Sequence, residues 1–209
     1  MTNDAPLRRL LTAIASVDDA EVLAMLTAAP ALVQARVEEG ARRAAAMDSY
    51  LSDIGHYAYA GDTLLHVAAA AHRPEIVREL IRRGASVEAR NRRGAAPLHY
   101  AADGNPTSPR WKPVAQAATI VGLIAAGADP NAVDKNGVTA LHRAVRTRCA
   151  QAVGTLLQCG ADALQRNGNG STPMMLATRQ TGRGGSGSHE AITQQAEIIR
   201  LREPYSAER

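Results

Sequence analysis

Residues 61–69 read Gly61-Asp62-Thr63-Leu64-Leu65-His66-Val67-Ala68-Ala69, and the pattern that they begin decides the fold. The stretch continues through Glu75-Ile76-Val77-Arg78-Glu79-Leu80-Ile81 and closes on Gly84-Ala85. A second copy begins at Gly94, a third at Gly137 and a fourth at Gly170. Four copies in phase predict one elongated body built from repeated units.

The first half of each copy has the residues that start a helix. A Thr before the helix can cap its free N–H groups, and a Pro at the first helical position loses no hydrogen bond. In the second copy Ala96 replaces this Thr, which typically costs about 1 kcal/mol, so we expect it to be the least protected interior copy. The later copies read Ala96-Pro97-Leu98-His99-Tyr100-Ala101-Ala102, Thr139-Ala140-Leu141-His142-Arg143-Ala144 and Thr172-Pro173-Met174-Met175-Leu176-Ala177.

The second half of each of the first three copies predicts an amphipathic helix that ends in a left-handed turn. Gly84, Gly127 and Gly160 suit that turn. Apolar residues precede it at the spacing of one helical face. They are Ile76, Val77, Leu80 and Ile81, then Ile120, Leu123 and Ile124, then Val153, Leu156 and Leu157.

The period and the signature resemble the ankyrin repeat, whose unit is a β-turn followed by two antiparallel helices. The resemblance covers about residues 61–205 and implies an all-α solenoid of stacked helix-turn-helix units with short β-turn fingers. It also implies a protein-binding function. We expect one domain over residues 1–209. Its parts are a capping helix pair (1–38), an insert (39–60) and repeats one to four (61–93, 94–136, 137–169 and 170–205).

The segments before repeat one are predicted to be a degenerate N-terminal cap and a long insert. Residues 7–15 and 20–28 are typical of a helix pair, with Asp19 as the expected cap of the second helix. The insert holds three of the five tyrosines. Tyr57 and Tyr59, with His56, either fasten the insert onto repeat one or form an aromatic corner of the binding face.

Two further insertions interrupt the repeats. Residues 104–113 are bounded by prolines and contain Trp111, the only tryptophan, and residues 182–188 are rich in glycine and serine. The first insertion either contacts a partner or packs locally, and the second is typical of a flexible linker.

The bulk composition indicates a cytoplasmic protein. No apolar stretch is long enough for a membrane span, and nothing near the N-terminus has the features of a signal peptide. Cys149 and Cys159 have no second pair and suit reduced thiols. The net charge of +4 comes almost wholly from arginine, which reflects either a GC-rich genome or an anionic partner.

Catalytic and metal sites are not expected. His66, His99 and His142 recur in phase, and the resemblance implies that they hydrogen-bond within and between repeats. Metal ligands would converge on one centre, whereas these should lie in a row. The sequence lacks paired nucleophile and base motifs, H-E-x-x-H and a Walker loop. We therefore predict a non-enzyme without cofactor or metal.

The expected binding face consists of turn tips and the exposed side of the first helix of each repeat, which the resemblance implies by position. Basic residues recur there and favour a protein partner with an acidic patch, without membrane contact. The alternatives are nucleic acid, which sparse aromatic interleaving disfavours, and a secreted effector. The predicted partner-binding residues are Tyr57, Tyr59, Arg92, Arg93, Asp103, Trp111, Lys135, Asn136, Arg143, Arg146 and Arg179.

Overall fold

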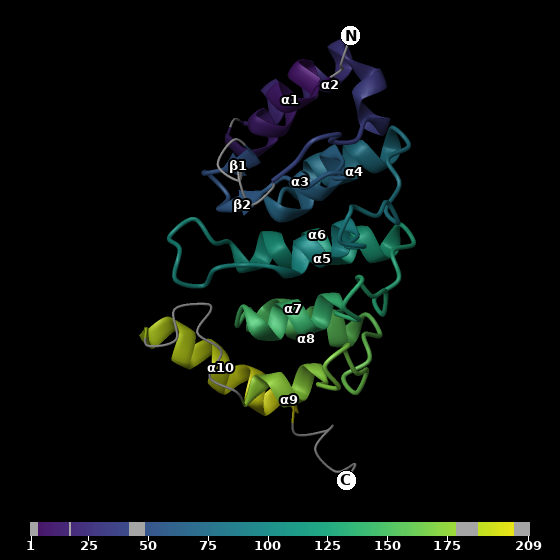
Figure 1. Cartoon of the computed structure of the whole chain (residues 1–209). Helices are drawn as coiled ribbons and strands as arrows, with labels where there is room; N and C mark the ends of the chain where they lie inside the picture. The colour runs from purple at the N-terminus through teal and green to yellow at the C-terminus, as the bar shows by residue number, and fades with distance from the viewer. Residues whose placement is uncertain (1–3, 17, 42–48, 179–187, 203–209) are drawn as a thin grey trace.

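Helix pairs stack in a row from one end of the molecule to the other (Figure 1). The structure, a computed structural model, describes residues 4–16, 18–41, 49–178 and 188–202. The inner helices of repeats one to four are α3 (Leu64–Ala70), α5 (Pro97–Ala102), α7 (Ala140–Arg146) and α9 (Pro173–Ala177). The outer helices are α4 (Pro74–Arg82), α6 (Pro113–Ala125), α8 (Ala150–Gln158) and α10 (His189–Arg202). The predicted all-α solenoid is confirmed.

The N-terminal helix pair is present, but its cap is not the residue that we predicted. Helices α1 (Asp4–Ser16) and α2 (Asp19–Ala28) are followed by a short 3₁₀ helix, η1 (Pro30–Gln34). Asp18 caps α2, because its Oδ1 accepts a hydrogen bond from the Glu21 backbone N–H at 2.9 Å. Asp19 is the first residue of α2 and instead accepts from Arg73 Nε at 2.7 Å. Arg73 also donates to the Ile14 carbonyl at 2.8 Å, so it fastens the N-terminal pair onto repeat one.

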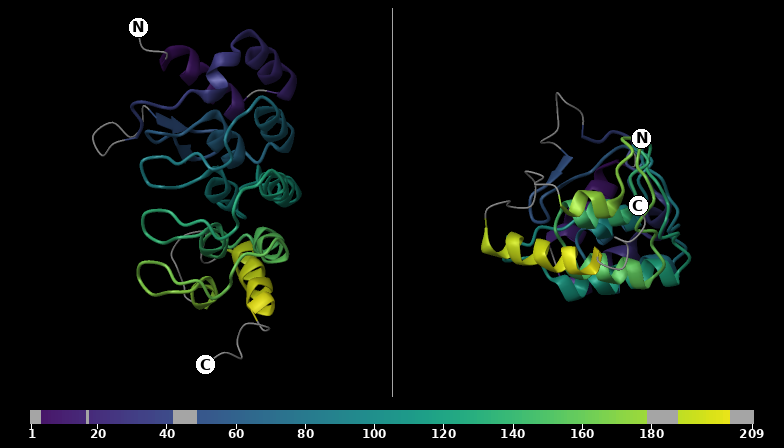
Figure 2. Two further views of the ribbon diagram at one scale, coloured as in Figure 1. Left: turned by 90° about the vertical axis from the view of Figure 1, so that its right-hand side faces the viewer. Right: turned by 90° about the horizontal axis from the view of Figure 1, so that it is seen from below.

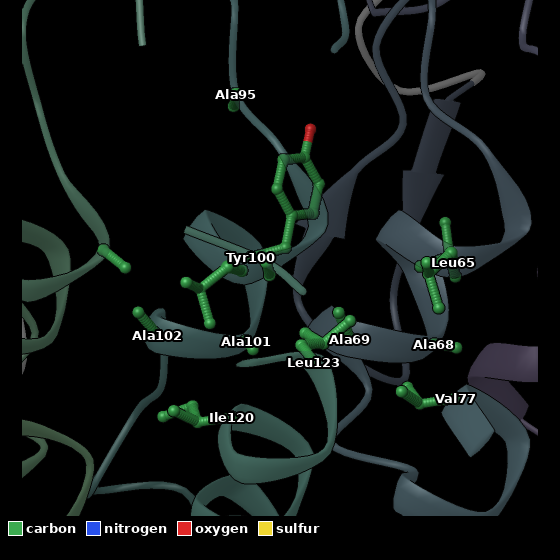
Figure 3. Packing of buried hydrophobic residues seen from close by; sticks show 14 of the residues in the cluster. Leu65, Ala68, Ala69, Val77, Ala95, Tyr100, Ala101, Ala102, Ile120 and Leu123 are labelled. Carbon is green, nitrogen blue, oxygen red and sulfur yellow. The ribbon is translucent and has the colours of Figure 1, made fainter. Parts of the chain in front are cut away.

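The core runs the length of the stack between inner and outer helices. Figure 3 shows Leu65 and Val77 of repeat one and Ile120 and Leu123 of repeat two, which are at most 1% exposed. Each of inner helices α3 and α5 also carries a pair of alanines with no exposed surface, and these small side chains let neighbouring helices approach closely. These alanines are Ala68, Ala69, Ala101 and Ala102.

The three repeating histidines connect successive inner helices. The backbone N–H of Thr63 donates to His66 Nδ1 at 3.2 Å, and the other ring nitrogen, Nε2, lies 3.1 Å from the Ala95 carbonyl of repeat two. Since Nδ1 accepts, the proton resides on Nε2, which donates to that carbonyl. His99 and His142 repeat this arrangement toward Val138 and Ser171. Burial lowers the pKa of His66 to about 3 and that of His99 to about 4, so both rings are neutral near pH 7.

The fingers between the helix pairs project from one side of the stack, as Figure 2 shows. Their backbones are hydrogen-bonded in series: Arg92 N to Ala60 O at 2.8 Å, Lys135 N to Arg93 O at 3.0 Å, and Gly168 N to Asn136 O at 2.8 Å. These hydrogen bonds hold successive finger tips side by side.

The insert before repeat one contains a two-stranded hairpin, which the sequence reasoning did not predict. Strands β1 (Tyr50–Leu51) and β2 (His56–Tyr57) pair antiparallel, with Tyr50 opposite Tyr57. Gly55 in the connecting turn has a φ of 63°, a conformation that glycine adopts without strain. The Tyr50 and Tyr57 rings contact each other across the two strands, with their centroids 4.8 Å apart, and this contact helps to stabilise the hairpin.

Candidate functional site

The finger tips of repeats one and two present a row of cations. Arg92, Arg93, Lys135 and Asn136 are all exposed. The guanidinium carbon of Arg93 lies 4.3 Å from the centre of the Tyr59 ring, and that of Arg92 lies 5.5 Å from it. Cation–π contacts of this kind hold the two charges over the ring without neutralising them.

A buried polar network supports these fingers from below. Asp62 accepts hydrogen bonds from the Tyr59 backbone N–H at 2.7 Å, from Asn91 Nδ2 at 2.8 Å and from the Tyr100 hydroxyl at 2.9 Å. Burial raises the pKa of Asp62 to about 6, although the three hydrogen bonds oppose this shift. Asn91 also accepts from the Arg93 backbone N–H at 2.9 Å, so the network fixes the finger that carries Arg93.

Arg143, which the sequence assigned to partner binding, lies in a nearly buried ion-pair cluster. It is 9% exposed, donates from Nη1 to Asp103 at 2.9 Å and from Nη2 to Asp134 at 3.3 Å. Arg146 lies 3.9 Å from the other carboxylate oxygen of Asp103. Within this cluster two carboxylates balance much of the arginine charge, so Arg143 contributes little to an external potential.

A hollow of about 420 Å³ lies between the fingers and the inner helices of repeats two and three. Its walls contain the Tyr59 and Arg93 pair, Asn136, and Asp103 with its partners Arg143 and Arg146. The structure therefore brings together six of the eleven residues that the sequence assigned to partner binding.

Trp111 lies outside this hollow, at the edge of the loop between α5 and α6. Its indole Nε1 donates to Gln116 Oε1 at 2.8 Å, and the buried Gln116 amide donates to the Ala101 carbonyl at 3.0 Å. Trp111 packs against the core and is only partly exposed. Tyr57 is half-buried, and its ring contacts that of Tyr50 on the other strand of the hairpin. Arg179 and the glycine loop of residues 182–188 lie outside the described residues.

Sequence reasoning missed the buried polar residues that position the fingers and Arg143. Asn91 and Asp62 pair within repeat one, and Tyr100 of repeat two donates to Asp62. Asp134 of repeat two accepts from Arg143 of repeat three. All four of these side chains, Asp62, Asn91, Tyr100 and Asp134, are buried. One signal was available: Asn91 and Asp134 occupy the same place relative to the following glycine, where an Asx side chain typically accepts backbone N–H groups of a turn.

Within the described ranges, no three His, Cys, Asp or Glu side chains are grouped so that they could hold a metal ion. None of the described helices has the length and apolar character needed to cross a membrane.

Comparison with known proteins agrees with the architecture. The chain is 39% identical over 103 residues to the E3 ubiquitin-protein ligase KEG of Arabidopsis thaliana, a match that covers 48% of this chain and 6% of that protein. It is 37% identical over 117 residues to Ankyrin repeat and SOCS box protein 16 of Mus musculus, covering 55% of this chain and 25% of that protein. The B-cell lymphoma 3 protein of Homo sapiens is 35% identical over 100 residues, which cover 48% of this chain and 21% of that protein.

This chain thus spans a quarter or less of the length of each of these relatives. A family model described as ankyrin repeats (3 copies) matches residues 21–108 and 114–194, which are most of the sequence. The regular helix pairs, the stacked fingers and the row of histidines agree with that match, and the chain belongs to the ankyrin repeat family.

Proposed function

We propose that this chain is a non-catalytic module that binds an acidic segment of a partner protein on its fingers and inner helices. Ankyrin repeats are in general protein-binding modules, and this chain belongs to that family. The observation that carries the proposal is the row formed by Arg92, Arg93 and Lys135, which are exposed on adjacent fingers joined by backbone hydrogen bonds.

The charges of this row are available to a partner. Among the described residues, Arg92, Arg93 and Lys135 form no ion pair with a carboxylate. Arg92 donates to the Ala41 carbonyl and stacks on Tyr59, which positions its charge without cancelling it. Because Arg92 and Arg93 are held over Tyr59 before binding, a carboxylate-rich segment gains charge-assisted hydrogen bonds at a low ordering cost.

The histidines support a binding role without catalysis. His66, His99 and His142 are buried, and each uses both ring nitrogens in hydrogen bonds that join the repeats. A cytoplasmic location, where Cys149 and Cys159 stay thiols, belongs to the same proposal.

Charge reversal on the fingers tests the proposal. A partner is first isolated with the wild-type chain, purified, and titrated against the variant Arg92→Glu/Arg93→Glu/Lys135→Glu. The matched control reverses the same number of charges on the outer helices, Arg78→Glu/Arg82→Glu/Arg200→Glu, whose side chains are each at least 69% exposed. We expect the finger variant to weaken binding at least tenfold and the control to stay within about twofold of wild type. Equal affinities of the two variants would remove the fingers from the binding site.

Nucleic acid is the competing ligand, because the same cations would contact phosphates. Titration of wild type with duplex DNA and single-stranded RNA at several salt concentrations separates the two cases. A partner protein should bind tighter than either polyanion. A steep fall of nucleic-acid affinity with salt, together with affinity above that for the protein, would favour the alternative.

A further inference from the structure

Two insertions that interrupt the repeat pattern meet in the folded chain. The turn of the hairpin, at Asp53, contacts the loop between α5 and α6, at Arg110. Arg110 Nη1 lies 3.0 Å from Asp53 Oδ1, although the two residues are 57 positions apart. The side chains of Arg110 and Asp53 are 70% and 41% exposed, so the contact forms a rim at the surface and is not part of the core.

Beneath this rim is a second hollow of about 430 Å³, within the size range of sites for small ligands. Its walls combine the two insertions with the end of helix α3. The half-buried Ile54, Ala71 and Trp111 supply apolar and aromatic surface, and the buried Tyr100 lies behind them. The hydrogen bond from Trp111 to Gln116 holds the indole in place, so this wall exists before any partner arrives.

One polar group of the wall lacks a partner. His56 lies on strand β2, its ring centroid is 4.4 Å from that of Tyr100, and it lines this hollow. Its Nε2 atom is buried and has no hydrogen-bond partner. Burial is the main cause that lowers the pKa of His56, to about 4, so the ring is neutral near pH 7 and suits an uncharged ligand group.

We propose that this hollow receives a tyrosine side chain of the partner, with the ring against Trp111 and the hydroxyl hydrogen-bonded to His56 Nε2. A hydroxyl both donates and accepts, so it satisfies Nε2 in either tautomer of the imidazole, whereas an indole N–H only donates. Aromatic anchors in preformed pockets commonly dominate the affinity of protein interfaces.

This inference rests on the proposed function and specifies its partner. His56, Tyr100 and Asp103 line both hollows, so the tyrosine hollow adjoins the basic face. The partner would therefore be an acidic segment that carries a tyrosine.

The test uses small uncharged probes on the whole chain. N-acetyl-tyrosinamide, N-acetyl-phenylalaninamide and N-acetyl-alaninamide are titrated while backbone and indole N–H signals are followed by NMR. We expect the tyrosine probe to shift the signals of Gly55, Gly104 and the Trp111 indole, with a dissociation constant of about 1 mM. It should bind about two- to tenfold tighter than the phenylalanine probe, because only the tyrosine probe satisfies His56.

Two variants locate the binding site. His56→Leu should bring the affinities for the tyrosine and phenylalanine probes together. Ala71→Phe, at the C-cap of α3, should fill the hollow and abolish binding of both probes. The matched control is Ala126→Phe, at the exposed C-cap of α6, which should bind the probes like wild type. Helical content and probe binding are measured on the same samples, and Ala71→Phe decides the test if His56→Leu does not fold.

The inference is overturned if the tyrosine probe shifts no signal of the hollow, if it binds no tighter than the phenylalanine probe, or if Ala71→Phe binds both probes like wild type. Since the probes carry no charge, the finger variant should bind them like wild type. If the probes do not bind in the hollow but the finger variant still binds the partner more weakly than wild type, the tyrosine pocket alone is rejected. If the probes bind in the hollow but the finger variant binds the partner like wild type, the acidic partner alone is rejected.

Discussion

The carboxylate of Asp103, at the end of inner helix α5, accepts a hydrogen bond from Nη1 of Arg143 on inner helix α7 at 2.9 Å. The sequence assigned both residues to the contact with a partner. Their pairing joins repeat two to repeat three and places one positive and one negative charge in a nearly buried cluster. The charge of the proposed binding face is therefore carried mainly by the finger tips.

Replacing Asp103 by Asn should destabilise the fold by about 2–3 kcal/mol, because it leaves the nearly buried Arg143 with Asp134 as its remaining carboxylate partner. Urea unfolding followed by circular dichroism measures this change. Asp53→Asn breaks the exposed pair with Arg110 and should cost less than about 1 kcal/mol. Equal losses in the two variants would show that burial of the Asp103 pair does not matter.

Stability should fall as the pH drops from about 6.5 toward 4. Burial lowers the pKa of His56, His66 and His99 to between about 3 and about 4, so these rings stay neutral in the folded chain while the unfolded chain takes up protons. Their contribution is complete above pH 6.5 and is lost as the pH falls through the folded values. Asp62 has a raised pKa of about 6 and acts in the opposite direction, but it is one group against three.

His99→Gln tests this pH dependence. It should reduce the loss of unfolding free energy between about pH 7 and pH 4.5 by about 1–3 kcal/mol. His189→Gln changes an exposed histidine of α10 and should leave the loss as in wild type. A wild-type chain that is equally stable at both pH values would contradict the neutral, buried state of these rings.

Gly137→Ala should destabilise the chain more than Gly127→Ala. Both glycines have positive φ values, 70° and 98°, where an added Cβ costs about 1–2 kcal/mol. At Gly137 the Cβ would also lie 2.8 Å from the Gly168 backbone nitrogen, whereas at Gly127 it would meet nothing within 4 Å. We expect a further loss of at least about 1 kcal/mol at Gly137, measured by thermal unfolding. Equal losses would show that the fingers can separate without cost.

Repeat two should gain stability when its missing cap is restored. Thr139 and Thr172 accept hydrogen bonds from backbone N–H groups at 3.3 and 3.1 Å, and Ala96 has no oxygen to do so. Ala96→Thr should stabilise the chain by about 1 kcal/mol. Amide exchange should show wild-type α5 exchanging faster than α7 and the variant slowing α5. Slower exchange in wild-type α5 than in α7 would contradict the prediction that repeat two is the least protected interior copy.

The fold was largely predictable because its information is local and repeated. A Thr or a Pro at a fixed position, or both, starts each inner helix, and the glycine turns end the outer helices of repeats one to three. The hairpin of residues 50–57 was missed, although Tyr50, Tyr57 and the turn at Gly55 are a recognisable hairpin signal. Asp18 and Asp19 show the limit of such reasoning, because either carboxylate fits a cap and a contact with Arg73 selects between them.

The sequence by itself determined that helix pairs stack in a row, because this follows from spacing within a repeated unit. The resemblance to the ankyrin repeat implied that the histidines join neighbouring repeats and that the arginines recur toward one face. Only the tertiary structure decided which arginines are balanced by carboxylates and which insertions meet. Arg143 with Asp103 and Arg110 with Asp53 are 40 and 57 positions apart, and no local propensity specifies contacts over that distance. They form because stacking brings those side chains together, and the same stacking shapes the two hollows of the proposed binding face.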